Sequence, residues 1–197
     1  MRPSDLPPVL LLLALAACNM AMSDHPMFAA DERLTTPLKN GLWAADDPDC
    51  AVDVTLPTDK WPECAFWAVV GDNQVIDVSE KKADRPAGFL IAGGRPPIVQ
   101  IEMIDKERRV YFFYAVEPLA SAPSSPATAL NLWAVACGTA KVPGSTGQID
   151  PYPGLDKDCR PASKEALRAA AAASRAAQDR AAEKQIMRMH WVRAEPR

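Results

Sequence analysis

The sequence predicts an α+β fold, in which a mainly antiparallel β-sheet or incomplete barrel carries one packed C-terminal helix. Between Gly41 and Cys137, short apolar stretches recur and are separated by clusters of Gly, Pro and Asp, which is typical of antiparallel strands joined by turns. After Pro161 an alanine-rich segment spans 163–185, which is long enough for a helix. The chain is 48% hydrophobic and 24% charged, as expected for a globular domain with its own core.

The expected strands lie at 52–56, 64–70, 75–78, 89–92, 98–104, 109–117 and 128–137. The first is indicated by the alternation of Val52, Val54 and Leu56 with small or polar neighbours. Gly71-Asp72-Asn73 and the Gly- and Pro-rich cluster 93–97 are turn or breaker sequences. The connections at 119–127 and 138–158 are rich in Pro, Ser or Gly, so we expect loops there.

A register test supports the hairpin formed by 98–104 and 109–117. Asp105-Lys106-Glu107-Arg108 is expected to be its four-residue loop. Pairing Ile104 with Arg109 brings three apolar or aromatic side chains of each strand to one face, with Val99, Ile101 and Met103 opposite Tyr114, Phe112 and Val110. A shift by one residue would destroy this segregation, so the sequence predicts this register.

The C-terminal part begins with the helix at 163–185, for which Ser163 is the expected N-cap. Its alanine-rich face could lie close to a sheet. Apolar and polar residues then alternate over 187–191. This favours a returning strand at 187–193, with a last helical turn as the alternative.

The cysteines predict disulfides and one modification site. Cys50, Cys64, Cys137 and Cys159 include no Cys-x-x-Cys pair, which favours disulfides over zinc ligation. Three connectivities are possible, and we favour the neighbour pairing Cys50–Cys64 and Cys137–Cys159, which closes the shorter loops. Setting Cys18 aside leaves an even set of four, which suits an oxidising compartment.

The segment before Cys18 carries the most specific motif of the chain. The apolar run at 9–17 suits a signal-peptide core and is shorter than the roughly 20 residues that cross a bilayer. It ends in Leu15-Ala16-Ala17-Cys18, which resembles the lipobox of bacterial lipoproteins. The alternative is cleavage at the Ala-x-Ala sequence at 14–16, which would leave a secreted protein with a free Cys18; the odd cysteine count favours the lipoprotein.

The lipobox resemblance implies a membrane-anchored lipoprotein. Cys18 would be the acylated first residue of the mature protein, anchored by about 0.8 kcal/mol for each buried CH₂. Asn19 follows it in place of the Asp that retains lipoproteins in the inner membrane, so the resemblance implies the outer membrane, facing the periplasm. We therefore expect a signal peptide at 1–17, a lipidated flexible tether at 18–40 and a single periplasmic β-rich domain at 41–197.

Charge is distributed unevenly along the chain. From Arg160 onward there are nine Lys or Arg and four Asp or Glu, although the net charge of the whole chain is −3. The interpretation that we favour is a basic element docked on its own acidic domain. The alternative is a basic end that meets anionic lipid or polymer.

No residue pattern indicates catalysis. The acidic run Asp46-Asp47-Pro48-Asp49 lacks the spacing of a calcium loop and is expected to be a solvated turn. Of the two histidines, His25 lies in the expected tether and His190 lies beside Trp191. The sequence has neither a nucleophile elbow nor a phosphate-binding glycine loop. We expect no catalytic residue, metal or cofactor, and the compartment and net charge exclude nucleic acid as a partner.

Short stretches of the mature part resemble small envelope lipoproteins of Gram-negative bacteria: Gly41-Leu42-Trp43, Asp49-Cys50 and Trp61-Pro62-Glu63-Cys64-Ala65. This resemblance implies no activity. Four tryptophans are expected to fill the core rather than line a ligand site, namely Trp43, Trp61, Trp67 and Trp133. We expect a non-enzymatic binding or envelope-scaffold module, whose partners are the membrane, through Cys18, and an envelope protein or polymer. The alternative is an inhibitor or chaperone of an envelope enzyme.

Overall fold

The computed structural model describes residues 19–34, 38–71, 74–79, 86–105, 107–119, 125–140, 149–180 and 186–194. The expected signal peptide at 1–17 and the lipidation site Cys18 lie outside these residues. The elements are β1 (Met22–Ser23), η1 (Ala30–Glu32), β2 (Gly41–Ala45), η2 (Thr58–Lys60), β3 (Trp67–Gly71), β4 (Gln74–Val78), β5 (Pro86–Ala92), β6 (Ile98–Asp105), β7 (Arg108–Pro118), β8 (Ala129–Ala134), β9 (Gly138–Ala140), β10 (Ile149–Pro151), α2 (Lys164–Arg180) and β11 (Met187–Arg193).

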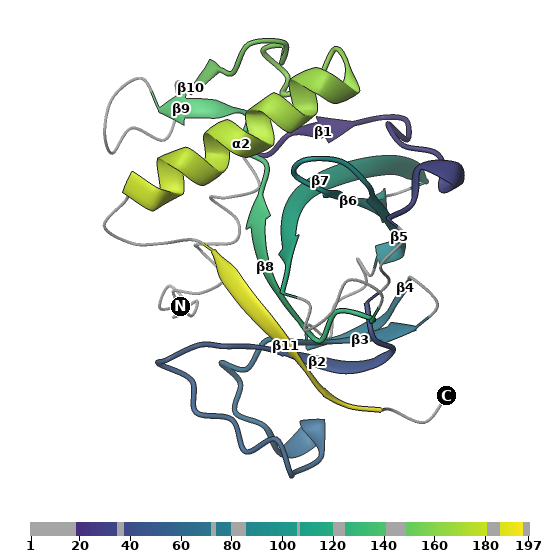
Figure 1. The fold of residues 1–197 in the computed structure, drawn as a ribbon, viewed down its shortest axis with the longest axis vertical. Coiled ribbons are helices and arrows are strands. Elements are labelled where there is room, and N and C mark those ends of the chain that lie inside the picture. The colour runs from purple at the N-terminus through teal and green to yellow at the C-terminus, as the bar shows by residue number, and fades with distance from the viewer. Residues whose placement is uncertain are drawn as a thin grey trace, which may run out of the picture.

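The main sheet is antiparallel and curls into a nearly closed barrel (Figure 1). Its strand order is β4-β3-β2-β11-β8-β7-β6-β5, and β1 adds to it by pairing with β7. The outer strands β4 and β5 lie beside each other and bring the two edges of the sheet together. The mainly antiparallel, barrel-like sheet predicted from the sequence is thus present, and the last segment is a strand, β11, between β2 and β8.

The β6–β7 hairpin has the predicted register. Val99, Ile101 and Met103 of β6 pair with Tyr114, Phe112 and Val110 of β7. The pairing continues to Asp105 and Arg108, so the connection is shorter than the four-residue loop that we expected. Glu107 in this connection has a φ of 79°, which is typical of the two-residue turns that match the twist of a hairpin.

The inner face of the barrel is packed with apolar side chains from most of its strands. Trp43 in β2, Val99 in β6, Leu130 in β8 and Met189 in β11 are all buried in this core. Trp43 also satisfies its polar atom, since its Nε1–H donates to the carbonyl of Lys39 at 2.8 Å. Alternate residues of each strand point into the barrel. The residues between them face outward and can pack against a second layer outside the barrel.

Helix α2 supplies part of this outer layer, against β8. Leu167, Ala170 and Ala171 are fully buried and belong to the same apolar cluster as Phe113 of β7 and Trp133 of β8. The small alanine side chains let the helix backbone approach the sheet closely. The Nε1–H of Trp133 reaches the carbonyl of Ala171 at 3.0 Å as a result. The predicted packing of the helix on the sheet is therefore present over 164–180, and 181–185 lie outside the described residues.

Two serines fix the position of α2. Ser163 is the N-cap, as predicted, because its Oγ accepts the amide of Ala166 at 3.2 Å. Ser174 is buried, accepts the amide of Ala136 at 2.9 Å and donates to the carbonyl of Ala170 at 2.7 Å. Its hydroxyl thus ties the helix to the chain just after β8.

Residues 19–34 pack against the barrel, which corrects the expectation of a flexible tether at 18–40. Met20, Ala21 and Phe28 are buried, although the segment has no hydrophobic period. Irregular backbone of this kind makes few ladder hydrogen bonds, so its apolar residues need not recur with the period of a strand or helix.

A buried glutamine of β6 holds this segment in place. The Oε1 of Gln100 accepts the amides of Met27 at 2.7 Å and Phe28 at 3.0 Å, and its Nε2 donates to the carbonyl of Phe28 at 3.3 Å. The Gln100 side chain therefore gives the backbone of Met27 and Phe28 hydrogen bonds of the kind that a neighbouring strand would give.

Residues 46–66 form a loop on the outer face of β2, at the lower end of the molecule in Figure 1. Cys50, Trp61 and Ala65 pack there on Leu42 and Ala44 of β2. The loop thus forms a small core of its own, separate from the inner face of the barrel.

The strand predicted at 52–56 is absent, so that prediction was wrong. The Oδ1 of Asp53 accepts the amide of Thr55 at 3.0 Å and its hydroxyl at 2.6 Å, and this local turn replaces strand pairing. Val54 and Leu56, which gave the alternating pattern, are instead exposed.

The disulfides have the predicted pairing, Cys50–Cys64 and Cys137–Cys159. The first joins two residues within the 46–66 loop, which packs on β2. The second joins the end of β8 to the segment before α2. The region 138–158 between its two cysteines, expected to be a loop, contains the short hairpin β9–β10.

Candidate functional site

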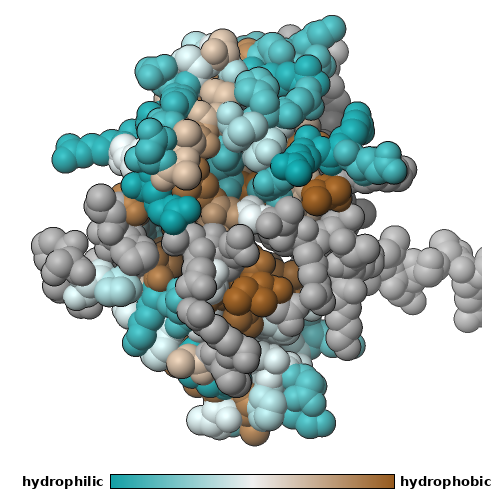
Figure 2. Space-filling view, turned by 90° about the vertical axis from the view of Figure 1, so that its right-hand side faces the viewer, coloured by the Kyte–Doolittle hydropathy of each residue, from teal (hydrophilic) through white to brown (hydrophobic). Residues whose placement is uncertain are grey.

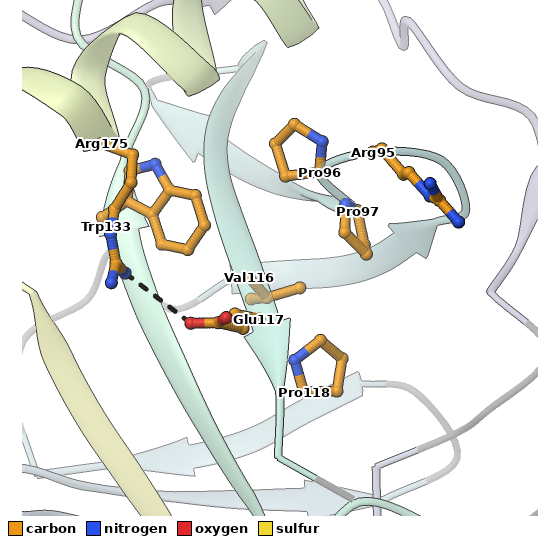
Figure 3. A pocket seen from close by; sticks show the side chains of 8 residues that line it. All are labelled: Arg95, Pro96, Pro97, Val116, Glu117, Pro118, Trp133 and Arg175. Atoms are coloured by element: carbon orange, nitrogen blue, oxygen red, sulfur yellow. Dashed lines mark ion pairs between the residues drawn. The ribbon is translucent and has the colours of Figure 1, made fainter. Parts of the chain in front are cut away.

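A hollow of about 320 Å³ opens between helix α2, strands β7 and β8, and the turn that joins β5 to β6 (Figure 3). Its volume is at the lower end of the range for small-ligand sites. The lining combines an apolar wall with charged side chains: Arg95, Pro96, Pro97, Val116, Glu117, Pro118, Trp133 and Arg175. This combination makes it the candidate site.

Arg175 of α2 is the central charged group of the hollow. Its guanidinium carbon lies 5.2 Å from the centroid of the Trp133 ring, in a cation–π contact. Its Nη1 lies 3.9 Å from Glu117 Oε2 (Figure 3). Its Nε lies 3.4 Å from Asp179 Oδ1. Glu117 also accepts a hydrogen bond from Asn131 Nδ2 at 2.9 Å. Both charged groups are thus held by neighbours on the surrounding elements.

One nitrogen of this guanidinium lacks a hydrogen-bond acceptor among the described residues. Arg175 Nη1 is buried and makes no hydrogen bond to any described residue, because 3.9 Å is too long for a hydrogen bond to Glu117. A guanidinium N–H can only donate a hydrogen bond, so a ligand group that pairs with it must be an acceptor such as a carbonyl oxygen. A full negative charge fits less well, since Glu117 is already beside it. The neighbouring prolines and Trp133 offer apolar contact to the rest of such a ligand.

The turn at the opposite rim is fixed by the helix. Arg168 Nη2 donates to the carbonyl of Gly93 at 2.6 Å, and the amide of Val116 donates to the carbonyl of Pro97 at 3.0 Å. Gly94 has a φ of 126°, and a Cβ there would lie 2.6 Å from Arg168 Nε, so the turn requires glycine at this position. The cluster read from the sequence as a breaker therefore presents Arg95 at the rim of the hollow.

The basic C-terminal part is docked on the acidic part of the chain, as the favoured interpretation of the charge distribution predicted. Among the described residues, four ion pairs between Lys or Arg and Asp or Glu join them: Arg160–Asp24 at 2.9 Å, Lys164–Glu32 at 2.6 Å, Arg175–Glu117 at 3.9 Å and Arg188–Asp46 at 3.3 Å. The amide of Ala29 and then Lys164 hold the pKa of Glu32 below its usual value.

The remaining candidates from the sequence lie apart from the hollow. His190 Nδ1 is 2.6 Å from Asp46 Oδ1, so one histidine meets the acidic run at 46–49. His25 lies in the N-terminal segment, with its Nδ1 3.4 Å from Ser23 Oγ. In the part of the chain that the structure describes, no three His, Cys, Asp or Glu side chains are grouped to hold a metal ion.

The tryptophans mostly occupy core positions, as predicted. Trp43, Trp61 and Trp133 are buried, whereas Trp67 is half-buried. Trp133 has a second role, because it also lines the hollow. Neither this role nor that of Arg175 was predicted from the sequence, since the hollow forms where α2 packs beside β8.

The face on the β4–β5 side of the barrel is seen in Figure 2, where hydrophobic side chains reach the surface in its middle part. Ile76 of β4 and Ile104 of β6 are among the exposed large hydrophobic residues. Both strands border stretches outside the described ranges, so we assign no site to this face.

No protein-family model matches the chain, and neither does any curated protein or solved structure. None of the helices in the described ranges is long and apolar enough to cross a membrane.

Proposed function

We propose that the chain is a non-enzymatic binding module of the Gram-negative envelope, anchored by lipid on Cys18 to the outer membrane and facing the periplasm. The observation that supports this most is the pairing of the other four cysteines in two disulfides. Disulfides are typical of oxidising compartments such as the periplasm. With those four cysteines paired, Cys18 is the one cysteine left for acylation.

Acylation is the first test. Mass spectrometry of the mature protein is expected to find acyl groups on an N-terminal Cys18, and density-gradient fractions are expected to place the protein with the outer membrane. Cys18→Ser should abolish both, because the modified thiol is absent. An unmodified N-terminus at Ala17 or later in the wild-type protein would refute the anchor.

The hollow beside Arg175 is the proposed binding site, and its chemistry favours an extended peptide segment of an envelope protein. A peptide carbonyl would accept from the guanidinium of Arg175, whose side chain is 31% exposed, and apolar side chains would meet Trp133 and the prolines of the lining. The described residues that line the hollow include no histidine, cysteine, serine or threonine, and their prolines, tryptophan and arginines suit binding.

Site-specific photocrosslinking in cells tests this site. A photoreactive amino acid in place of Arg95, which is exposed at the rim, should give a crosslinked product with an envelope protein. Adding Arg175→Gln should lower the yield about tenfold or more, since a hydrogen bond from a charged group contributes about 1.5–3 kcal/mol. The control is Arg188→Gln, which removes another partly exposed arginine and should leave the yield unchanged. Equal yields with both variants would exclude the hollow as the binding site.

A second candidate function, inhibition or chaperoning of an envelope enzyme, is favoured by the 46–66 loop. This loop is closed by the Cys50–Cys64 disulfide and exposes Val54 and Leu56, so it offers a rigid, partly apolar projection to an enzyme cleft. The same photoreactive amino acid at Leu56 distinguishes the two functions. A product with an enzyme at Leu56, together with none at Arg95, would favour the inhibitor or chaperone.

A further inference from the structure

We infer that the domain sits directly on the membrane, with the β9–β10 hairpin toward the bilayer and the 46–66 loop pointing away from it. This inference rests on the lipidation of Cys18 proposed above. It goes beyond that proposal because an anchor alone, on a flexible tether, would leave the orientation of the domain open.

The chain is bound to the barrel from Asn19 onward. The carbonyl of Asn19 accepts the amide of Cys137 at 2.9 Å, and its Nδ2 donates to the carbonyl of Gly138 at 3.3 Å. Two residues later, the amide of Ala21 donates to the carbonyl of Val135 at 2.8 Å. The residue next to the proposed lipid anchor is therefore bonded to the segment that joins β8 to β9.

The Cys137–Cys159 disulfide makes this attachment rigid. Cys137 bonds to Asn19, and the carbonyl of Cys159 accepts the amide of Met22 at 3.1 Å. Both ends of the bridge thus hold the same short segment. Asn19 and Met22 therefore bond to two residues whose relative position the disulfide fixes.

The distance from the acylated residue to the barrel is therefore one peptide unit. Consecutive Cα atoms are about 3.8 Å apart, whereas a free coil over 19–40 would reach about 25 Å. Acyl chains insert into the bilayer, so Cys18 must lie at the level of the lipid headgroups. Asn19 and the neighbouring strand β9, which begins at Gly138, must then lie at the membrane surface.

The shape of the molecule determines which parts lie far from the bilayer. The β9–β10 hairpin is near one end of the longest axis, and the 46–66 loop is at the other end (Figure 1). A domain attached at Asn19 consequently presents this loop to the periplasm, with the exposed side chains of Val54 and Leu56 away from the lipid.

Fluorescence quenching in vesicles tests the orientation. Acylation blocks Cys18 and the disulfides block the other cysteines, so one added cysteine is the single free thiol. Thr139→Cys in β9 and Thr55→Cys in the 46–66 loop make the same substitution at two exposed positions. The acylated protein is labelled with a thiol-reactive dye and placed in phosphatidylethanolamine–phosphatidylglycerol vesicles that contain a lipid with a headgroup nitroxide. The dye at 139 should be quenched several-fold more strongly than the dye at 55.

A flexible insertion provides the control. Twelve Gly and Ser residues placed between Cys18 and Asn19 span about 20 Å, which should remove most of the difference between the two dyes. Equal quenching at 139 and 55 without the insertion would overturn the inference, as would a difference that the insertion leaves unchanged. The mass of each preparation, measured by mass spectrometry, distinguishes the failure of the two proposals. A mass without acyl groups would refute the anchor. Equal quenching of the dyes at 139 and 55 in acylated protein would refute the orientation alone.

Discussion

Removing the Cys137–Cys159 disulfide is expected to lower the free energy of unfolding by about 3 kcal/mol, because the reduced chain gains the entropy of an open loop. The bridge closes a sequence separation of 22 residues. The loss should be measured by urea denaturation of a Cys137→Ala/Cys159→Ala variant. Without the bridge, the hydrogen bonds of Asn19 to Cys137 and of Met22 to Cys159 also lose their rigid support.

The other disulfide is a matched control for this variant. Cys50→Ala/Cys64→Ala opens a separation of 14 residues, so its loss from chain entropy is also about 3 kcal/mol. The two variants should differ in native-state hydrogen exchange, since only loss of the Cys137–Cys159 bridge should accelerate exchange at Ala21 and Met22. The same exchange rates in both variants would show that the bridge does not hold the N-terminal segment.

Replacing Gln100 by Leu is expected to destabilise the protein by about 2–4 kcal/mol, because one buried and one part-buried amide lose their acceptor, and a fully buried amide left unpaired costs about 1–3 kcal/mol. These are the amides of Met27 and Phe28, which donate to Gln100 Oε1. Urea denaturation measures the loss. Hydrogen exchange at Met27 and Phe28 should accelerate before the barrel unfolds.

The neighbouring outward-facing residue of β6 provides the control. Glu102→Leu removes an ion pair with Arg109, 3.1 Å long and largely exposed, so it should cost less than about 1 kcal/mol. If Gln100→Leu and Glu102→Leu lowered the free energy of unfolding by the same amount, the hydrogen bonds of Gln100 to the N-terminal segment would make no separate contribution to stability.

The sequence predicted those parts of the fold that depend on local pattern. The β6–β7 register followed from the segregation of apolar side chains, such as Val99 and Tyr114, to one face, which a shifted register would have lost. The cysteine pairing followed from loop length, and the helix start followed from the capping preference of Ser163.

Other parts of the fold do not follow from the hydrophobic pattern, because a local side-chain hydrogen bond or a residue far away in the sequence decides them. The segment 52–56 has the pattern of a strand, but Asp53 bonds to Thr55 and the segment turns instead. Residues 19–34 have no period, and the group that holds them, Gln100, lies on a distant strand. The candidate site was not predictable for the same reason, since Arg175 and Arg95 meet the same hollow only once α2 has docked on the barrel.

If the chain is exported as we propose, the position of β11 has a consequence for its folding. This strand lies between β2 and β8, so residues 41–45 and 129–134 cannot be joined in one sheet before residues 187–193 are present. A chain that crosses the inner membrane N-terminus first can form hairpins such as β6–β7 early, because their contacts are local. Closure of the barrel must wait until the last strand has been translocated. Release from the translocation channel and completion of folding should therefore coincide, and a chain cut before 187 should remain open and vulnerable to periplasmic proteases.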